Sequence, residues 1–185
     1  MTRSNAREIA VHLLYAMDYN GLTPDEAMAA SFEREYYAHL ASETDVYAER
    51  PNLKQREYIR NVLTGVTERR EELDGYIAEY AVGWNLSRIS RLAKCIMRVA
   101  MYESLYIDDV PTGVAMNEAV QLARKYEDEA AVPFINGILG SFSRRGAQAE
   151  PEQAPAEADD AAETGTPAEP EETLAEEPAQ EPDAQ

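Results

Sequence analysis

Cysteine and histidine are scarce in this sequence of 185 residues, which contains one Cys and two His. A single Cys95 excludes a disulfide framework and a cysteine-rich zinc site, and His12 and His39 leave too few ligands for a histidine cluster. The sequence also has no P-loop, no GxGxxG after a strand, no GxSxG and no HExxH motif. We therefore expect no catalytic residues, no metal and no cofactor.

Two of these scarce side chains each allow a chemical and a structural interpretation. Cys95 directly follows Lys94, so an activated thiolate is one interpretation, but the apolar neighbours favour an ordinary core cysteine. His12 has the chemistry of a ligand or a general base, but its helical spacing beside Ile9 and Leu13 favours a partly exposed helix residue. We prefer the structural interpretation for both.

Long hydrophobic runs are also absent. The longest apolar stretches are far shorter than the roughly 18 residues that a membrane-spanning helix needs. The N-terminal segment lacks an apolar region followed by a small-residue cleavage site, as a signal peptide would have. We therefore expect a cytoplasmic protein with no membrane partner.

Basic residues are missing from the last 40 residues of the chain. Residues 146–185 carry 13 acids, six of the ten prolines and Leu174 as the only large aliphatic residue. Residues 1–145 carry all 17 basic residues and 22 acids, a net charge of -5. A segment as acidic and as poor in large apolar residues as 146–185 cannot bury a core. We therefore predict a folded domain over 1–145 and a disordered acidic tail, rich in Ala, Glu and Pro, over 146–185.

Helical periodicity dominates the first 145 residues. No stretch alternates apolar and polar residues for long enough to require a strand, so the sequence predicts an all-α fold. Ser4 is a candidate cap for the first helix, and Asn20 with Gly21 is a typical helix end.

The second helix has a strong start signal, a Thr23 cap followed by Pro24 and Glu26. Apolar spacing predicts that this helix runs through Phe32 to about Leu40.

Further helices are expected after a polar loop over 42–52. Gly65 and Gly75 predict a bend or close packing somewhere between them in the next helical stretch. A strongly apolar helix over 87–107, capped by Ser87 or Ser90, is expected to be the most buried. With two more helical patterns before residue 145, the prediction is a compact bundle of six to seven helices.

Several polar residues interrupt the apolar helical segments: Arg98, Glu103, Asn117, Glu118 and Asn136. Burial of each such group costs roughly 1–3 kcal/mol unless it is hydrogen-bonded, so we expect a structural polar network. A catalytic interpretation is the alternative, but no nucleophile or metal ligand lies nearby in the sequence.

Several segments, in order and at matching spacing, resemble the NusB transcription antitermination factor family. They are REIAV and LY at 7–11 and 14–15, YIRNVLTGV at 58–66, LDGYI at 73–77, IMRVAMYESLYIDDVPTGVAMNEAVQLARKY at 96–126, and FINGIL at 134–139. The resemblance covers about residues 3–144. It implies two small helical bundles, no enzymatic activity, and a heterodimer with the ribosomal protein NusE that binds the box A element of ribosomal RNA leaders. In that family the complex helps RNA polymerase to read through terminators and supports ribosomal RNA maturation, and some members form homodimers.

The resemblance also suggests binding residues. RNA contacts are expected at Arg3, Arg7, Tyr15, Tyr126 and Phe134, because arginines neutralise phosphates and aromatic rings stack on unpaired bases. The family's basic cluster is reduced in this chain, so we expect weak RNA binding without NusE. Contacts with the partner protein are expected on the helices around 73–107, with Glu79 and Lys94 as candidates.

Two other functions remain as alternatives. One is a helical protein-interaction module that has lost RNA recognition. The other is the N-terminal domain of a ribosomal RNA cytosine methyltransferase, which we disfavour because no residues for a catalytic domain remain after position 145.

Overall fold

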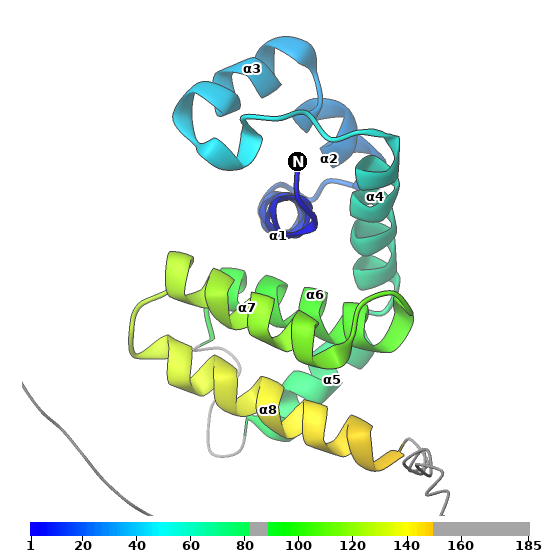
Figure 1. Ribbon diagram of the computed structural model, residues 1–185, viewed down its shortest axis with the longest axis vertical. Helices are drawn as coiled ribbons and strands as arrows, with labels where there is room; N and C mark the ends of the chain where they lie inside the picture. The colour runs from blue at the N-terminus through cyan, green and yellow to red at the C-terminus, as the bar shows by residue number, and fades with distance from the viewer. Residues whose placement is uncertain (82–88, 150–185) are drawn as a thin grey trace, which may run out of the picture. The chain divides into compact units, whose positions relative to one another are not determined.

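The computed structural model describes residues 1–81 and 89–149 and shows only helices in these ranges (Figure 1). The all-α prediction is confirmed, whereas most of the predicted disordered tail, at 150–185, lies outside the described residues. The helices are α1 (Arg3–Asn20), α2 (Pro24–Ser31), α3 (Arg34–Glu43), the 3-10 helix η1 (Asp45–Tyr47), α4 (Leu53–Glu68), α5 (Arg70–Tyr80), α6 (Arg91–Tyr106), α7 (Thr112–Tyr126) and α8 (Ala131–Ala149). Helix α8 continues four residues past the predicted domain end at 145.

The cap of the first helix lies two residues earlier than predicted. Thr2, and not Ser4, accepts a hydrogen bond from the backbone N–H of Asn5. The end of α1 was predicted correctly, because Gly21 adopts the left-handed conformation with φ of 70°. The capping box of Thr23 and Glu26 at the start of α2 is also present.

The helix predicted over 23–40 is in fact two helices. Helix α2 ends at Ser31, and the Glu33 carboxylate then accepts hydrogen bonds from the backbone N–H groups of Glu35 and Tyr36. This side-chain cap satisfies the free donors of a new helix start, so the chain turns into α3. Apolar periodicity continues across the break, which is why it concealed the turn.

A second break, at Arg69, separates α4 from α5 and confirms the bend predicted between Gly65 and Gly75. Neither glycine forms the break. Gly65 instead allows close packing of α4 on α6, because the Tyr102 ring occupies the space where a Cβ atom would lie. These two breaks explain why the described residues contain eight α-helices and not six or seven.

The helices form an upper group, α1 to α4, and a lower group, α5 to α8 (Figure 1). Helix α1 packs on α4 within its own group and on α6 of the other group, so one continuous core joins them. Helix α6 also packs on α4, α5, α7 and α8, and its interior residues, Cys95 to Glu103, are all buried. This helix was predicted to be the most buried; Ser90 caps it, and Ser87 lies outside the described residues.

Within the part of the chain that the structure describes, no helix combines the length and the apolar character that a membrane span requires.

Candidate nucleic-acid interface

Arg7 lies in the interior of the domain, although it was expected to contact RNA. Its side chain extends from α1 to Glu103 on α6, with Nε 2.5 Å from Oε2 and Nη2 2.8 Å from Oε1. A third nitrogen, Nη1, lies 2.8 Å from Oε2 of Glu118 on α7, and Tyr58 donates to Glu103 Oε1 at 2.8 Å. The exposed fraction is 3% for Arg7 and 0% for Glu103. The guanidinium is therefore paired with two carboxylates of its own chain, and we exclude Arg7 from the RNA-binding surface.

We call this group the Arg7 network; it consists of Arg7, Tyr58, Glu103 and Glu118. Its contacts shift the pKa values of Arg7 and Tyr58. Burial lowers the pKa of Arg7, but its hydrogen bonds and attraction to Glu103 outweigh that effect and leave the pKa raised. Burial, followed by the negative charge of Glu103, raises the pKa of Tyr58. Arg7 therefore stays charged at neutral pH, with Tyr58 as a neutral donor.

Arg98 belongs to a separate network, so the predicted polar residues do not all join one network. Its guanidinium contacts Asp74 on α5 through Nε at 2.7 Å and Nη2 at 2.9 Å, and Asp18 on α1 through Nη1 at 3.0 Å. Arg70 also pairs with Asp18, at 2.7 Å. This Arg98 network links α1, α5 and α6 around the start of α5.

Asn117 and Asn136 do not belong to either network, which corrects their predicted burial. Both are exposed and line a groove of about 500 Å³ between α7 and α8, together with Arg124 and Arg144. Each sits on the outward side of an amphipathic helix, where an amide can be hydrated without loss.

Cys95 is a core cysteine, as preferred from the sequence. It is buried, with its Sγ atom 3.9 Å from Oδ2 of Asp18. Burial, followed by the charge of Asp18, raises the pKa of the thiol to about 12. The thiol is therefore protonated at neutral pH, and the activated-thiolate interpretation is wrong.

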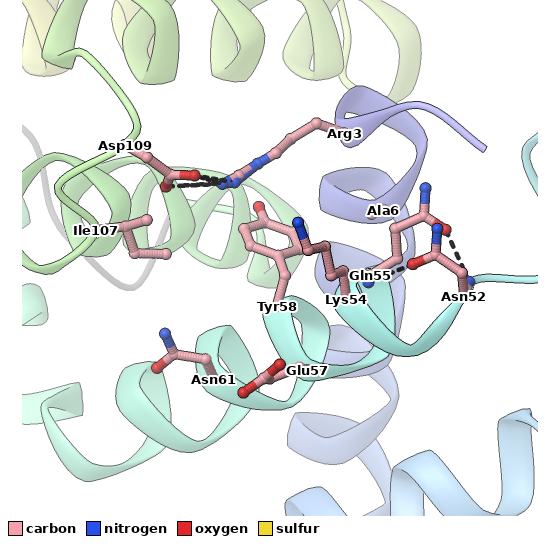
Figure 2. A pocket seen from close by; sticks show the side chains of 10 residues that line it. All are labelled: Arg3, Ala6, Asn52, Lys54, Gln55, Glu57, Tyr58, Asn61, Ile107 and Asp109. Carbon is pink, nitrogen blue, oxygen red and sulfur yellow. Dashed lines mark hydrogen bonds and ion pairs between the residues drawn. The ribbon is translucent and has the colours of Figure 1, made fainter.

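Arg3 lies at the mouth of a pocket between the start of α1 and α4. Figure 2 shows its guanidinium reaching Asp109, with Nη2 2.6 Å from Oδ2, and its Cζ lies 4.8 Å from the centroid of the Tyr58 ring. The pocket has a volume of about 520 Å³ and is also lined by Lys54 and Asn61. Because the Arg3 and Asp109 side chains are 37% and 73% exposed, their ion pair is weak and leaves Arg3 available to a phosphate.

The aromatic candidates lie on another side of α1. At 3.6 residues per turn, Tyr15 projects about 120° away from Arg3 around the helix. Tyr15 is 41% exposed, and Tyr126 from the end of α7 reaches the same side of α1, where its hydroxyl lies 2.9 Å from Nε2 of His12. Phe134, near the start of α8, is half-buried and packs against the core. Tyr15 and Tyr126 thus lie on the same side of α1, and Arg3 projects from another side.

His12 is the centre of a polar cluster, which we call the His12 cluster. Its other members are Glu8, Tyr47, Lys125 and Tyr126. Its Nδ1 lies 3.0 Å from the Tyr47 hydroxyl, and the Tyr126 hydroxyl also donates to Glu8. Lys125 pairs with the same Glu8 oxygen at 2.6 Å. Burial, opposed by Glu8 and assisted by Lys125, lowers the pKa of His12. His12 is therefore a partly buried, neutral residue that holds Tyr126 in place.

Acidification is expected to destabilise the domain through His12. The unfolded chain binds a proton near the usual histidine pKa of about 6.5, above the pKa of the folded state, so stability falls as pH drops below that value. Urea unfolding of the wild type and of His12→Gln, from pH 8 to pH 5, measures this effect, and we expect the wild type to lose more stability. His39→Gln, an exposed histidine on α3, is the matched control. Equal losses for the wild type and His12→Gln would contradict the assignment.

The two candidates for partner binding lie on neighbouring helices. Glu79 on α5 is exposed and pairs with Arg145 on α8. Lys94 on α6 is half-buried, next to the buried Ala93. Their role stays a prediction.

Three surface residues near the aromatic candidates were missed. They are Tyr19, which is 70% exposed, Arg91 at the start of α6, and Lys125 of the His12 cluster. Tyr19 follows Tyr15 by four residues, a spacing that marks a shared helix side and could have identified it. Arg91 carried no such signal, because its position beside α1 results from tertiary packing.

These features define a class of small all-helical protein with buried ion-pair networks and an exposed aromatic and basic surface. Among residues 1–81 and 89–149, no group of three side chains is placed to hold a metal ion. Residues 4–144 match the model of the NusB family. The transcription antitermination protein NusB of Symbiobacterium thermophilum is 39% identical over 144 residues, which cover 78% of this chain and 90% of that protein. The chain therefore belongs to the NusB family.

Solved structures agree with this family at the level of the fold. The NusB structure of T. maritima superposes with a TM-score of 0.64 at 23% identity, covering 78% of this chain and 92% of the other. A crystal structure of NusB and NusE in complex with double-stranded RNA has a TM-score of 0.60 at 23% identity and covers 77% and 96%. In keeping with the absence of catalytic motifs, the curated relative is named as an antitermination protein and not as an enzyme.

Proposed function

We propose that this protein is a cytoplasmic transcription antitermination factor. In this proposal it pairs with the ribosomal protein NusE, binds box A RNA of ribosomal RNA leaders, joins the RNA polymerase antitermination complex and promotes read-through and RNA maturation. The observation that carries the proposal is the family match, which spans nearly the whole described helical unit, residues 4–144. The antitermination name of the curated relative, and the similar fold of the NusB that was crystallised with NusE and double-stranded RNA, support it.

The proposed RNA surface consists of Tyr15, Tyr126, Phe134 and Arg3. An exposed tyrosine ring can stack on an unpaired base, and Lys125 beside Tyr126 adds positive charge for a phosphate. Because Arg7 is committed to Glu103 and Glu118, this surface has less positive charge than the sequence suggested. Weak binding by the protein alone is therefore part of the proposal, and the partner supplies the remaining charge.

The partner surface is proposed on α5 and α6, with Glu79 and Lys94 as candidate contacts. Arg145 already pairs with Glu79 within the chain, so a basic partner would have to compete with it. The alternative of a methyltransferase domain has no support in the curated relative, of which this chain covers 90%.

Fluorescence anisotropy with a labelled box A oligomer tests the proposed function. We expect selective binding relative to a scrambled oligomer, weak for the protein alone and much tighter after NusE is added. Tyr15→Ala should weaken binding by the heterodimer about 5-fold or more, the effect of one lost base stack. Tyr36→Ala, an exposed tyrosine on α3, is the matched control and should bind like the wild type.

Absence of selective binding in both formats would reject the RNA function. The protein would then be better described as a helical protein-interaction module, the second candidate.

A further inference from the structure

We infer that Tyr19 and Arg91 form an additional nucleotide subsite next to Tyr15, where one base stacks on Tyr19 and an adjoining phosphate meets Arg91. The inference rests on the proposed RNA function and assigns further contacts to it. The ligand is a single strand, because only unpaired bases expose their faces to an aromatic side chain.

The first observation is the placement of the two tyrosines on α1. Tyr15 is 41% and Tyr19 is 70% exposed. Four residues apart, they project only about 40° from each other, with Cβ atoms about 6 Å apart. Successive bases of one strand can therefore reach the two rings, as on other single-strand stacking surfaces.

The second observation is a basic residue that α6 brings to the outer tyrosine. The Cζ atom of Arg91 lies 5.6 Å from the centroid of the Tyr19 ring, and Arg91 is itself exposed. An arginine over the ring strengthens a stacking platform through cation–π attraction and keeps its fork of N–H donors free for phosphate. Scattered exposed tyrosines need no explanation, but an exposed tyrosine paired with an exposed arginine has the chemistry of a nucleotide contact.

The third observation is that carboxylates near Arg91 have other partners. Asp18, one residue before Tyr19, pairs with Arg70 and Arg98. Glu127 accepts a hydrogen bond from Ser90. Arg91 has no carboxylate partner among the residues that the structure describes, and the first turn of α6 contains no acid. Arg91 is the first residue of α6, so the positive end of the helix dipole adds to its charge, and no acid in the first turn offsets it.

The subsite is continuous with the proposed RNA surface. Tyr15 lies one turn beyond His12 on α1, and His12 holds the Tyr126 hydroxyl. Glu127, next to Tyr126, joins the end of α7 to Ser90 and thus to Arg91 at the start of α6. A strand that contacts Tyr126 and Tyr15 would reach Tyr19 and Arg91 along the same side of α1.

Single substitutions separate the two roles. In box A titrations of the NusE heterodimer, we expect Tyr19→Ala to weaken binding about 5-fold or more and Tyr19→Phe to bind like the wild type, because stacking uses the ring. Arg91→Ala should lower the slope of log affinity against log salt by about 0.7, the value for one lost phosphate contact on a single strand. Tyr36→Ala and Arg34→Ala, exposed residues on α3, are the matched controls.

Two outcomes would overturn the inference in distinguishable ways. If Tyr15→Ala weakens selective binding while Tyr19→Ala and Arg91→Ala match the wild type in affinity and salt slope, the subsite is wrong and the proposed function stands. If the wild-type heterodimer shows no selective binding, both fail. Circular dichroism and urea unfolding of each variant verify that the side chains, and not the fold, cause the differences.

Discussion

Replacement of Glu103 by alanine is expected to lower the free energy of unfolding by about 3–5 kcal/mol, the largest effect of any single change that we predict. The side chain is completely buried and accepts from both Arg7 and Tyr58. Its removal leaves the buried Arg7 guanidinium with Glu118 as its only carboxylate and leaves the Tyr58 hydroxyl without an acceptor. Urea denaturation followed by circular dichroism measures the change.

Two variants control for this prediction. Glu129→Ala removes an exposed carboxylate between α7 and α8 and should change stability by less than about 0.5 kcal/mol. The double variant Arg7→Met with Glu103→Leu removes both buried charges and should lose less stability than Glu103→Ala alone, because no unpaired guanidinium remains. A loss below about 1 kcal/mol for Glu103→Ala would refute the proposed importance of the network.

The second large effect is expected at Gly65, where alanine should destabilise the domain by about 1–3 kcal/mol. A Cβ atom at this position would overlap the Tyr102 ring, which is only 4% exposed and therefore has little room to move. Displacement of the ring would also weaken the hydrogen bond from the Tyr102 hydroxyl to Asn61 Oδ1, which is 2.8 Å long. Thermal and urea unfolding of Gly65→Ala measure this cost.

Gly75 provides the matched control in the neighbouring helix. A Cβ atom there meets no atom within 4 Å, so Gly75→Ala should stabilise the domain by about 0.5–1 kcal/mol through the higher helix propensity of alanine. In addition, Gly65→Ala should be partly rescued by Tyr102→Leu, which vacates the overlapping space. If both glycine variants change stability in the same direction, close packing at Gly65 is not the reason for the glycine.

Local signals explain which features could be predicted from the sequence. The Thr23 capping box and the Gly21 helix end depend on residues within one turn, so their recognition required no knowledge of the fold. The break at Glu33 was missed because its cap is a single carboxylate within continuous helical periodicity. Resemblance identified the family, but it did not identify the role of every residue: Arg7, expected to contact RNA, is buried.

Arg7 illustrates the limit of reading a surface from a motif. Arg3 and Arg7 look equivalent in a basic N-terminal segment, four residues apart. Only the packing of α1 on α6 determines that Arg7 meets Glu103, which lies 96 positions away, while Arg3 remains at a pocket mouth. The same packing brings Arg91 over Tyr19.

The linear pattern of apolar residues, caps and composition was therefore sufficient for the all-α class, because each signal acts through neighbours along the chain, and the resemblance of ordered segments identified the family. The division of polar residues into buried networks and exposed surface required the tertiary structure. Whether a charge faces water or another charge depends on which helices pack together, and helical periodicity does not specify that partner.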